Sequence, residues 1–143
     1  MLGTQLNNTI LTEAKMIGAN LTNANLTQAE MNGVNLTVAK LIDSNLTKAN
    51  LTASNLSESN LANANLQEAK LTRAKMIETT LNKSVLTKAW MMQVNLSHAN
   101  FTEAKMIETN LSDANLTLAT MRMADLTDAN LRHANMVVKD KSA

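Results

Sequence analysis

The sequence predicts an all-β protein that forms a single four-sided β-helix of about seven 20-residue coils. Three observations support this prediction: an uninterrupted five-residue repeat, the absence of proline, and an apolar composition made almost entirely of Leu, Ala and Met. Hydrophobic residues make up 45% of the 143-residue chain, yet its only aromatic residues are Trp90 and Phe101. An ordinary domain with this hydrophobic share fills its core with a mixture that includes Phe, Tyr and Val.

The repeat defines which residues face the core. Every fifth residue from Leu6 to Met136 is large and apolar, and these 27 positions hold 19 Leu, seven Met and Phe101. The residue two positions before each of them is small, and 17 of these 27 residues are Ala. The position in between is most often Asn, and the other two positions are polar and variable. Such a register without insertions indicates one repeat architecture along the chain.

A period of five residues fits neither a helix nor a continuous strand. Five residues advance a helix by about 500°, so the Leu residues would drift around every side. On a strand, an odd period would send successive Leu residues to opposite faces. The chain must therefore turn once per repeat, and four turns of about 90° close one coil. Stacked about 4.8 Å apart, the coils would form a rod on the order of 30 Å long. The lack of proline agrees, because neighbouring coils need nearly every N–H.

The repeat unit Ala-Asn-Leu-Thr-X, present at Ala19–Asn23, Ala24–Gln28 and Ala114–Leu118, resembles that of pentapeptide-repeat proteins. The resemblance extends from about Thr4 to Val138, and it implies a right-handed, four-sided β-helix. The whole chain, 1–143, is then one domain with repeats over about 4–138 and a polar tail at 139–143. Many members of this family carry a helix that caps one end, and none is predicted here. We therefore expect either that a partner covers an end or that the chain is part of a larger protein.

Composition and charge argue against several classes of function. The chain has 13 Lys and Arg residues against 12 Asp and Glu residues and no cysteine. This balance gives no general attraction to nucleic acid, and the missing cysteines exclude thiolate sites. With neither a long apolar run nor a signal segment, we expect a cytoplasmic protein that does not bind membranes. His98 and His133 lie at separate corners of a convex rod, so we expect no enzyme activity, no metal and no cofactor.

Residues 20 apart in the sequence stack in one column on the outer surface. The column Lys48, Glu68, Lys88 and Glu108 alternates in charge and predicts ion pairs between coils, which contribute little to stability when exposed. Another column contains Asn25, Asn45 and Asn65, whose amides could form a hydrogen-bonded ladder. Both columns are interpreted as structural.

Trp90 interrupts this polar surface. Trp90 and Met92 occupy outward positions on either side of a core residue, and Val85 and Ile107 lie nearby around the preceding corner. Lys70 stacks against Trp90 from the adjacent coil, where a cation–π contact could form. Exposed Trp and Met residues are typical of protein-binding surfaces. These five residues are the candidate interaction site; the alternative is an indole that lies flat over its aliphatic neighbours.

The C-terminal end of the rod is a second candidate site. Leu118 and Val138 share a column, Met136 is the last core residue, and Val137 and Met123 are close. An open final coil exposes apolar core and unpaired backbone groups, which favours association. The family resemblance also implies a homodimer, since several members join end to end through an apolar C-terminal patch. The alternative is a final coil covered by its own tail.

These observations favour a non-enzymatic, rod-shaped scaffold that binds an unknown protein partner through the face around Trp90. Similarity to members with few caps points to a cyanobacterial type of protein. An alternative function is inhibition of DNA gyrase by DNA mimicry, which the resemblance implies for family members with acidic surfaces. Here the position before the core Leu carries Asp only at Asp125, so mimicry is disfavoured. The same position carries five lysines, spread over all four faces: Lys15, Lys40, Lys70, Lys75 and Lys105. A further alternative is a purely structural module of a larger protein.

Overall fold

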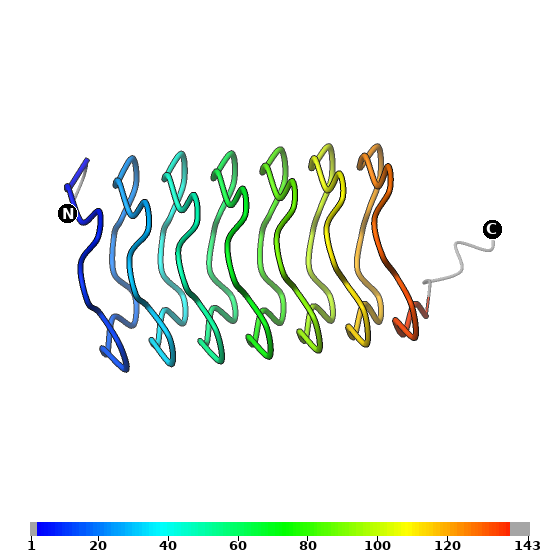
Figure 1. The fold of residues 1–143 in the computed structure, drawn as a ribbon, viewed down its shortest axis with the longest axis horizontal. Coiled ribbons are helices and arrows are strands. Elements are labelled where there is room, and N and C mark those ends of the chain that lie inside the picture. The colour runs from blue at the N-terminus through cyan, green and yellow to red at the C-terminus, as the bar shows by residue number, and fades with distance from the viewer. Residues whose placement is uncertain (1–2, 138–143) are drawn as a thin grey trace.

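A computed structural model describes residues 3–137 as a rod of stacked coils that runs from the N-terminal to the C-terminal end of the chain (Figure 1). Neighbouring coils are joined by parallel bridges between residues 20 apart, from Gln5↔Asn25 to Asn115↔Asn135. Within the described residues there is no helix, and each strand is reduced to a single bridging residue. The spacing of 20 is the one predicted from four corners per coil. The chain is therefore an all-β solenoid.

The backbone hydrogen bonds between coils point mostly one way along the rod. In the repeat 21–25, Leu21 and Asn23 donate their N–H groups to carbonyls of the following coil, at 2.7 and 2.9 Å. Asn25 donates to the preceding coil at 2.9 Å, and Ala24 closes the corner by donating to Leu21 at 3.0 Å. Each repeat thus sends two N–H groups toward the C-terminal end and one toward the N-terminal end.

The inside of the rod holds the large and small apolar residues of the repeat. From Leu21 to Leu116 the core positions are buried, and Phe101 occupies one of them without any exposed surface. In the end coils the equivalent residues, such as Leu6 and Leu131, are only partly buried. A narrow tube filled from four sides leaves room for Leu beside Ala, so the aromatic-poor composition follows from the geometry.

Each corner contains a residue in the left-handed backbone region. Every fifth residue from Gly3 to His133 has a φ between 54° and 67°. All three glycines of the chain, Gly3, Gly18 and Gly33, occupy this position, which glycine adopts without steric cost. Their shared position in the repeat was the signal in the sequence that could have predicted this conformation. Val38 has a φ of 59° here, which is unusual for a β-branched residue.

The asparagines before the core Leu residues stabilise the corners, and within residues 3–137 amide-to-amide hydrogen bonds between coils occur only at single steps, such as Asn115 to Asn95 at 3.3 Å and Asn130 to Asn110 at 3.2 Å. The Oδ1 atom of Asn25 accepts hydrogen bonds from the Thr27 N–H at 3.1 Å and the Thr27 hydroxyl at 2.7 Å. Its Nδ2 group donates to Gln5 in the preceding coil at 3.0 Å. Among the described residues, no hydrogen bond joins Asn25, Asn45 and Asn65 to one another. Their oxygens are used locally, because the corner presents donors two residues ahead.

Candidate protein-interaction face

Trp90 is held on the outside of the rod by a rigid stretch of backbone. It bridges Lys70 in one neighbouring coil and Asn110 in the other. Its N–H donates to Ala69 at 2.9 Å, and its carbonyl accepts from Leu71 at 2.7 Å. The side chain is 55% exposed. A large aromatic surface therefore stands in solvent on a backbone that is fixed on both sides.

Two hollows adjoin the indole of Trp90. One has a volume of about 360 Å³ and is lined by Glu68, Lys88, Ala89, Trp90, Glu108 and Asn110. The other has a volume of about 370 Å³ and is lined by Gln28, Glu30, Lys48, Glu68, Lys70 and Trp90. Both hollows contain Trp90 and Glu68, so they are neighbours on one surface. We call this surface, defined by the residues of the two hollows, the Trp90 face.

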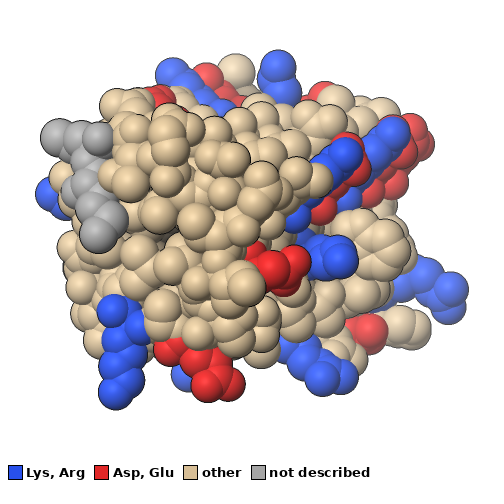
Figure 2. Space-filling view, turned by 60° about the vertical axis from the view of Figure 1, so that its left-hand side comes forward, with Lys and Arg blue, Asp and Glu red and all other residues tan. Residues whose placement is uncertain are grey.

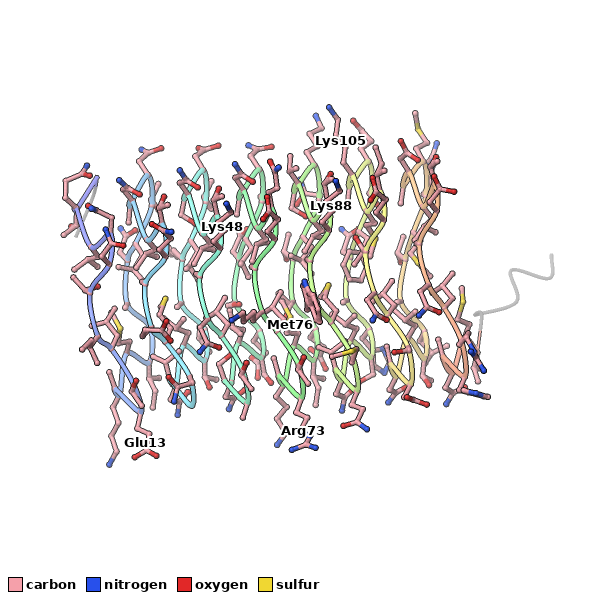
Figure 3. The ribbon with its side chains drawn as sticks, viewed as in Figure 1. Glu13, Lys48, Arg73, Met76, Lys88 and Lys105 are labelled. Atoms are coloured by element: carbon pink, nitrogen blue, oxygen red, sulfur yellow. The ribbon has the colours of Figure 1, made fainter. Side chains whose placement is uncertain are left out.

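Charged side chains border the Trp90 face in pairs. Lys48 lies 3.6 Å from Glu68, and Lys88 lies 3.6 Å from Glu108, measured from Nζ to the carboxylate oxygen. The ion pairs expected from the alternating column are therefore present, and Lys48 and Lys88 project from the same corner of the rod (Figure 3). Because all four side chains are about half exposed, each pair stabilises the fold by no more than about 1 kcal/mol. Each of these charged side chains can therefore exchange its partner for a charged group of another protein at little cost in free energy.

The structure brings together only some of the residues that the sequence singled out. Lys70 is exposed and lines a hollow with Trp90. Met92, Val85 and Ile107 are half-buried and line neither hollow. Their place is taken by charged residues, above all Glu68 and Glu108, which the sequence interpretation had treated as structural. The 20-residue column was the signal that placed them beside Trp90.

The C-terminal end has a separate, mostly apolar hollow. Its volume is about 330 Å³, and its lining residues are Leu116, Ala119, Met121, Arg122, Met136 and Val137. Met136 is 44% and Val137 54% exposed, while Met123 is 75% exposed without lining the hollow. Leu118 is half-buried outside it, and Val138 lies outside the described residues. Two of the five residues expected at this end therefore share one surface hollow.

Other kinds of site find no support in the described part of the chain. Residues 3–137 contain no group of three His, Cys, Asp or Glu side chains that could hold a metal ion. No helix within these residues has the length and apolar character of a membrane span. Charged residues of both signs are mixed on the face seen in Figure 2, without a stripe of one sign.

Comparison with known proteins identifies the repeat. The sequence model of the pentapeptide repeats matches eight copies, over residues 1–28, 19–58, 59–97 and 95–132. No curated protein sequence matches the chain.

Solved structures of similar fold come mainly from repeat proteins of the same kind. HetL from the cyanobacterium Nostoc sp. strain PCC 7120, described as involved in the regulation of heterocyst differentiation, is 26% identical with a TM-score of 0.61. That match covers 98% of this chain and 76% of HetL. Rfr23 from the cyanobacterium Cyanothece 51142 is 24% identical, with a TM-score of 0.27 and coverage of 98% and 86%. QnrB1, a plasmid-mediated fluoroquinolone resistance protein, is 13% identical, with a TM-score of 0.49 and coverage of 94% and 85%.

Proposed function

The chain belongs to the pentapeptide repeat family, and on that basis we propose that it is a non-enzymatic scaffold that binds another protein through the Trp90 face. One observation carries the proposal: a 55% exposed tryptophan, the only tryptophan of the chain, adjoins two hollows lined mostly by charged and polar residues. Tryptophan is enriched at the centres of protein interfaces, where it fills pockets of the partner. The role of HetL in the regulation of heterocyst differentiation supports a function through binding. Family membership also supports the right-handed turn and the count of about seven coils.

The chemistry of the face indicates what a partner must offer. A partner side chain that stacks on Trp90 would bury apolar area on a backbone that needs no ordering, so little conformational entropy is lost. The flanking ion pairs provide carboxylates and ammonium groups for a polar rim around this centre. We therefore expect a partner segment with an apolar or aromatic residue flanked by charges of both signs.

Capture with matched variants tests this function. The immobilised chain, its Trp90→Ala variant and a Thr80→Ala control would each be exposed to native lysate, and captured proteins would then be titrated individually. Thr80 occupies the equivalent outward position on another face. Trp90 is the only tryptophan, so its fluorescence reports binding at this face directly. We expect a specific partner to shift that fluorescence and to lose at least tenfold in affinity with Trp90→Ala alone. Unchanged affinity for every captured partner would refute the proposal.

The DNA-mimic alternative is less well supported. Mimicry requires carboxylates spaced like phosphates, with one charge per about 1.7 Å of duplex axis. The Lys48–Glu68 and Lys88–Glu108 pairs instead neutralise neighbouring carboxylates. We therefore expect no inhibition in a gyrase supercoiling assay, and inhibition at submicromolar protein would reverse this ranking. If the chain is instead a purely structural module of a larger protein, the immobilised chain should capture no specific partner protein on any of its faces.

We also propose that the chain associates with itself through its C-terminal coil, because the hollow at Met136 and Val137 exposes apolar surface there. We propose that both this association and the binding at the Trp90 face take place in the cytoplasm, which cell fractionation tests.

A further inference from the structure

The two end coils of the described rod present opposite sets of backbone groups. At the C-terminal end, seven of the N–H groups that in other repeats donate to the following coil have no backbone acceptor among residues 3–137; they belong to Met121, Met123, Leu126, Asp128, Leu131, His133 and Met136. At the N-terminal end, seven of the carbonyl oxygens that in other repeats accept from the preceding coil accept from no backbone N–H in the same range; they belong to Gln5, Asn7, Ile10, Thr12, Lys15, Ile17 and Asn20. The rod therefore ends in a face of donors on one side and a face of acceptors on the other.

A smaller set of backbone groups has the opposite arrangement, with donors at the N-terminal end and acceptors at the C-terminal end. The N–H groups of Gln5, Ile10, Lys15 and Asn20 donate to no described carbonyl, and the carbonyls of Ala119, Ala124, Ala129 and Ala134 accept from no described N–H. Backbone groups that are buried without a partner are costly, so contact between two ends requires that donors meet acceptors.

The spacing inside the rod shows how the two ends match. A core N–H donates to the carbonyl 19 residues ahead, as from Leu21 to Lys40, and an outward N–H donates 21 residues back, as from Asn25 to Thr4. If a second copy lay seven coils further along the rod axis, its residues would occupy the places of residues numbered 140 higher in the first copy. The same spacing of hydrogen bonds would then continue from one copy to the next. Leu126 would then donate to Gln5 of the second copy, and Met136 would donate to its Lys15. In return, Ile10 of the second copy would donate to Ala129.

We propose that this chain self-associates head to tail, with the C-terminal coil of one copy seated in register on the N-terminal coil of the next. The proposal rests on the proposed end association and assigns its direction. Five of these seven donors, from Leu126 to Met136, and the carbonyls of Ala124, Ala129 and Ala134 then find partners on the next copy. The partly buried core residues of both end coils are covered by the same contact.

The side chains of the end coils are compatible with this direction. His133 and Glu13 belong to the same corner column, so His133 of one copy would lie one step from Glu13 of the next. Within the rod, corner residues one step apart reach ion-pair distance, as the 3.6 Å between Lys48 and Glu68 shows. Glu13 lies at its corner near the N-terminal end (Figure 3), and a Cβ added at Gly33 in the following coil would lie 3.2 Å from its Cγ atom. An imidazole that donates to this carboxylate would add to the contact.

A symmetric contact between two C-terminal ends is less complementary. Such a dimer would bring together two faces that each present seven N–H donors but only four carbonyl acceptors without described partners, so several donors would have no acceptor. It would also be closed, because an isologous contact uses the same surface twice. A head-to-tail contact leaves one free end of each kind and can add further copies. The two arrangements therefore differ in the masses that they produce.

Sedimentation equilibrium over a concentration series distinguishes them. We expect the average mass of the intact chain to rise past that of two copies as its concentration increases. Glu13→Lys and His133→Glu alone should each weaken association by up to about fivefold, as expected for an exposed charge pair. The double variant should restore it, because position 133 meets position 13 of another copy. Glu58→Lys makes the same change at an exposed corner position in the middle of the rod and should have no effect.

Three results would overturn the proposal in different ways. A mass that stops at two copies and does not respond to Glu13→Lys would keep the end association but exclude the head-to-tail direction. A monomer at every concentration would refute both. Association lost with Trp90→Ala, while Glu13→Lys leaves it intact, would move the contact to the side of the rod.

Discussion

Val38 offers a test of whether the corners store backbone strain. This β-branched residue is held at a φ of 59° and is 52% exposed, so it gains little from burial in return. The left-handed conformation costs a residue with a Cβ about 1–2 kcal/mol, and asparagine tolerates it better than most other residues. We therefore expect Val38→Asn to stabilise the rod by about 1 kcal/mol. For a chain of this length, that corresponds to a rise in Tm of about 3 °C.

Gly18 supplies the reciprocal experiment in the same corner column, one coil earlier. Its φ is 66°, and a Cβ added there would meet no atom within 4 Å. Gly18→Val therefore adds the strain without a steric clash and should destabilise by about 1–2 kcal/mol. Urea unfolding followed by far-UV circular dichroism would measure both variants. If Val38→Asn lowers stability, or if Gly18→Val changes nothing, the strain argument is wrong.

Three further predictions concern the core and the corners. Phe101→Ala should cost about 3–5 kcal/mol in urea unfolding because the side chain is fully buried, and Phe101→Leu should cost less than about 1.5 kcal/mol. Asn25→Ala should cost about 1 kcal/mol by removing both bonds from Thr27, while Asn25→Asp should preserve them. Hydrogen bonds from the Thr127 hydroxyl and N–H, and then the charge of Lys105, lower the pKa of Asp125. Because the pKa of Asp125 is lower in the folded protein than in the unfolded chain, the ionised carboxylate stabilises the fold at pH values above the unfolded-state pKa. This stability is lost as the pH falls through the folded-state pKa. The wild type should therefore lose stability relative to Asp125→Asn below about pH 4; parallel acid melts would contradict this.

Much of the fold could be predicted from the sequence because its determinants are local. The two-residue spacing between the small residue and the Leu points both side chains inward, and this does not depend on distant contacts. Phe101 and Trp90 illustrate the result, since one occupies a core position and the other an outward position of the repeat. The left-handed residue of each corner was not predicted, although the three glycines marked its position in the repeat.

The candidate site was harder to predict because it depends on how side chains lie across coils. Trp90 was identified as an exposed residue, but Met92, expected beside it in the site, is half-buried and lines neither hollow. Glu68 and Glu108 lie in the coils before and after that of Trp90 and were interpreted only as members of a charged column. Which outward residues border a hollow depends on side-chain packing over several coils.

By itself, the sequence determined the five-residue register, the division into core and surface, and the columns of residues 20 apart. These follow from backbone geometry that every repeat shares, so one repeat contains the information for all. The position of the hollows beside Trp90 and the direction of the hydrogen bonds between coils became apparent only in the tertiary structure. Both arise when coils stack, because a hollow and a hydrogen bond need two neighbours. The opposite polarity of the two ends is the clearest case, since each repeat carries the same groups and only their stacking leaves donors at one end and acceptors at the other.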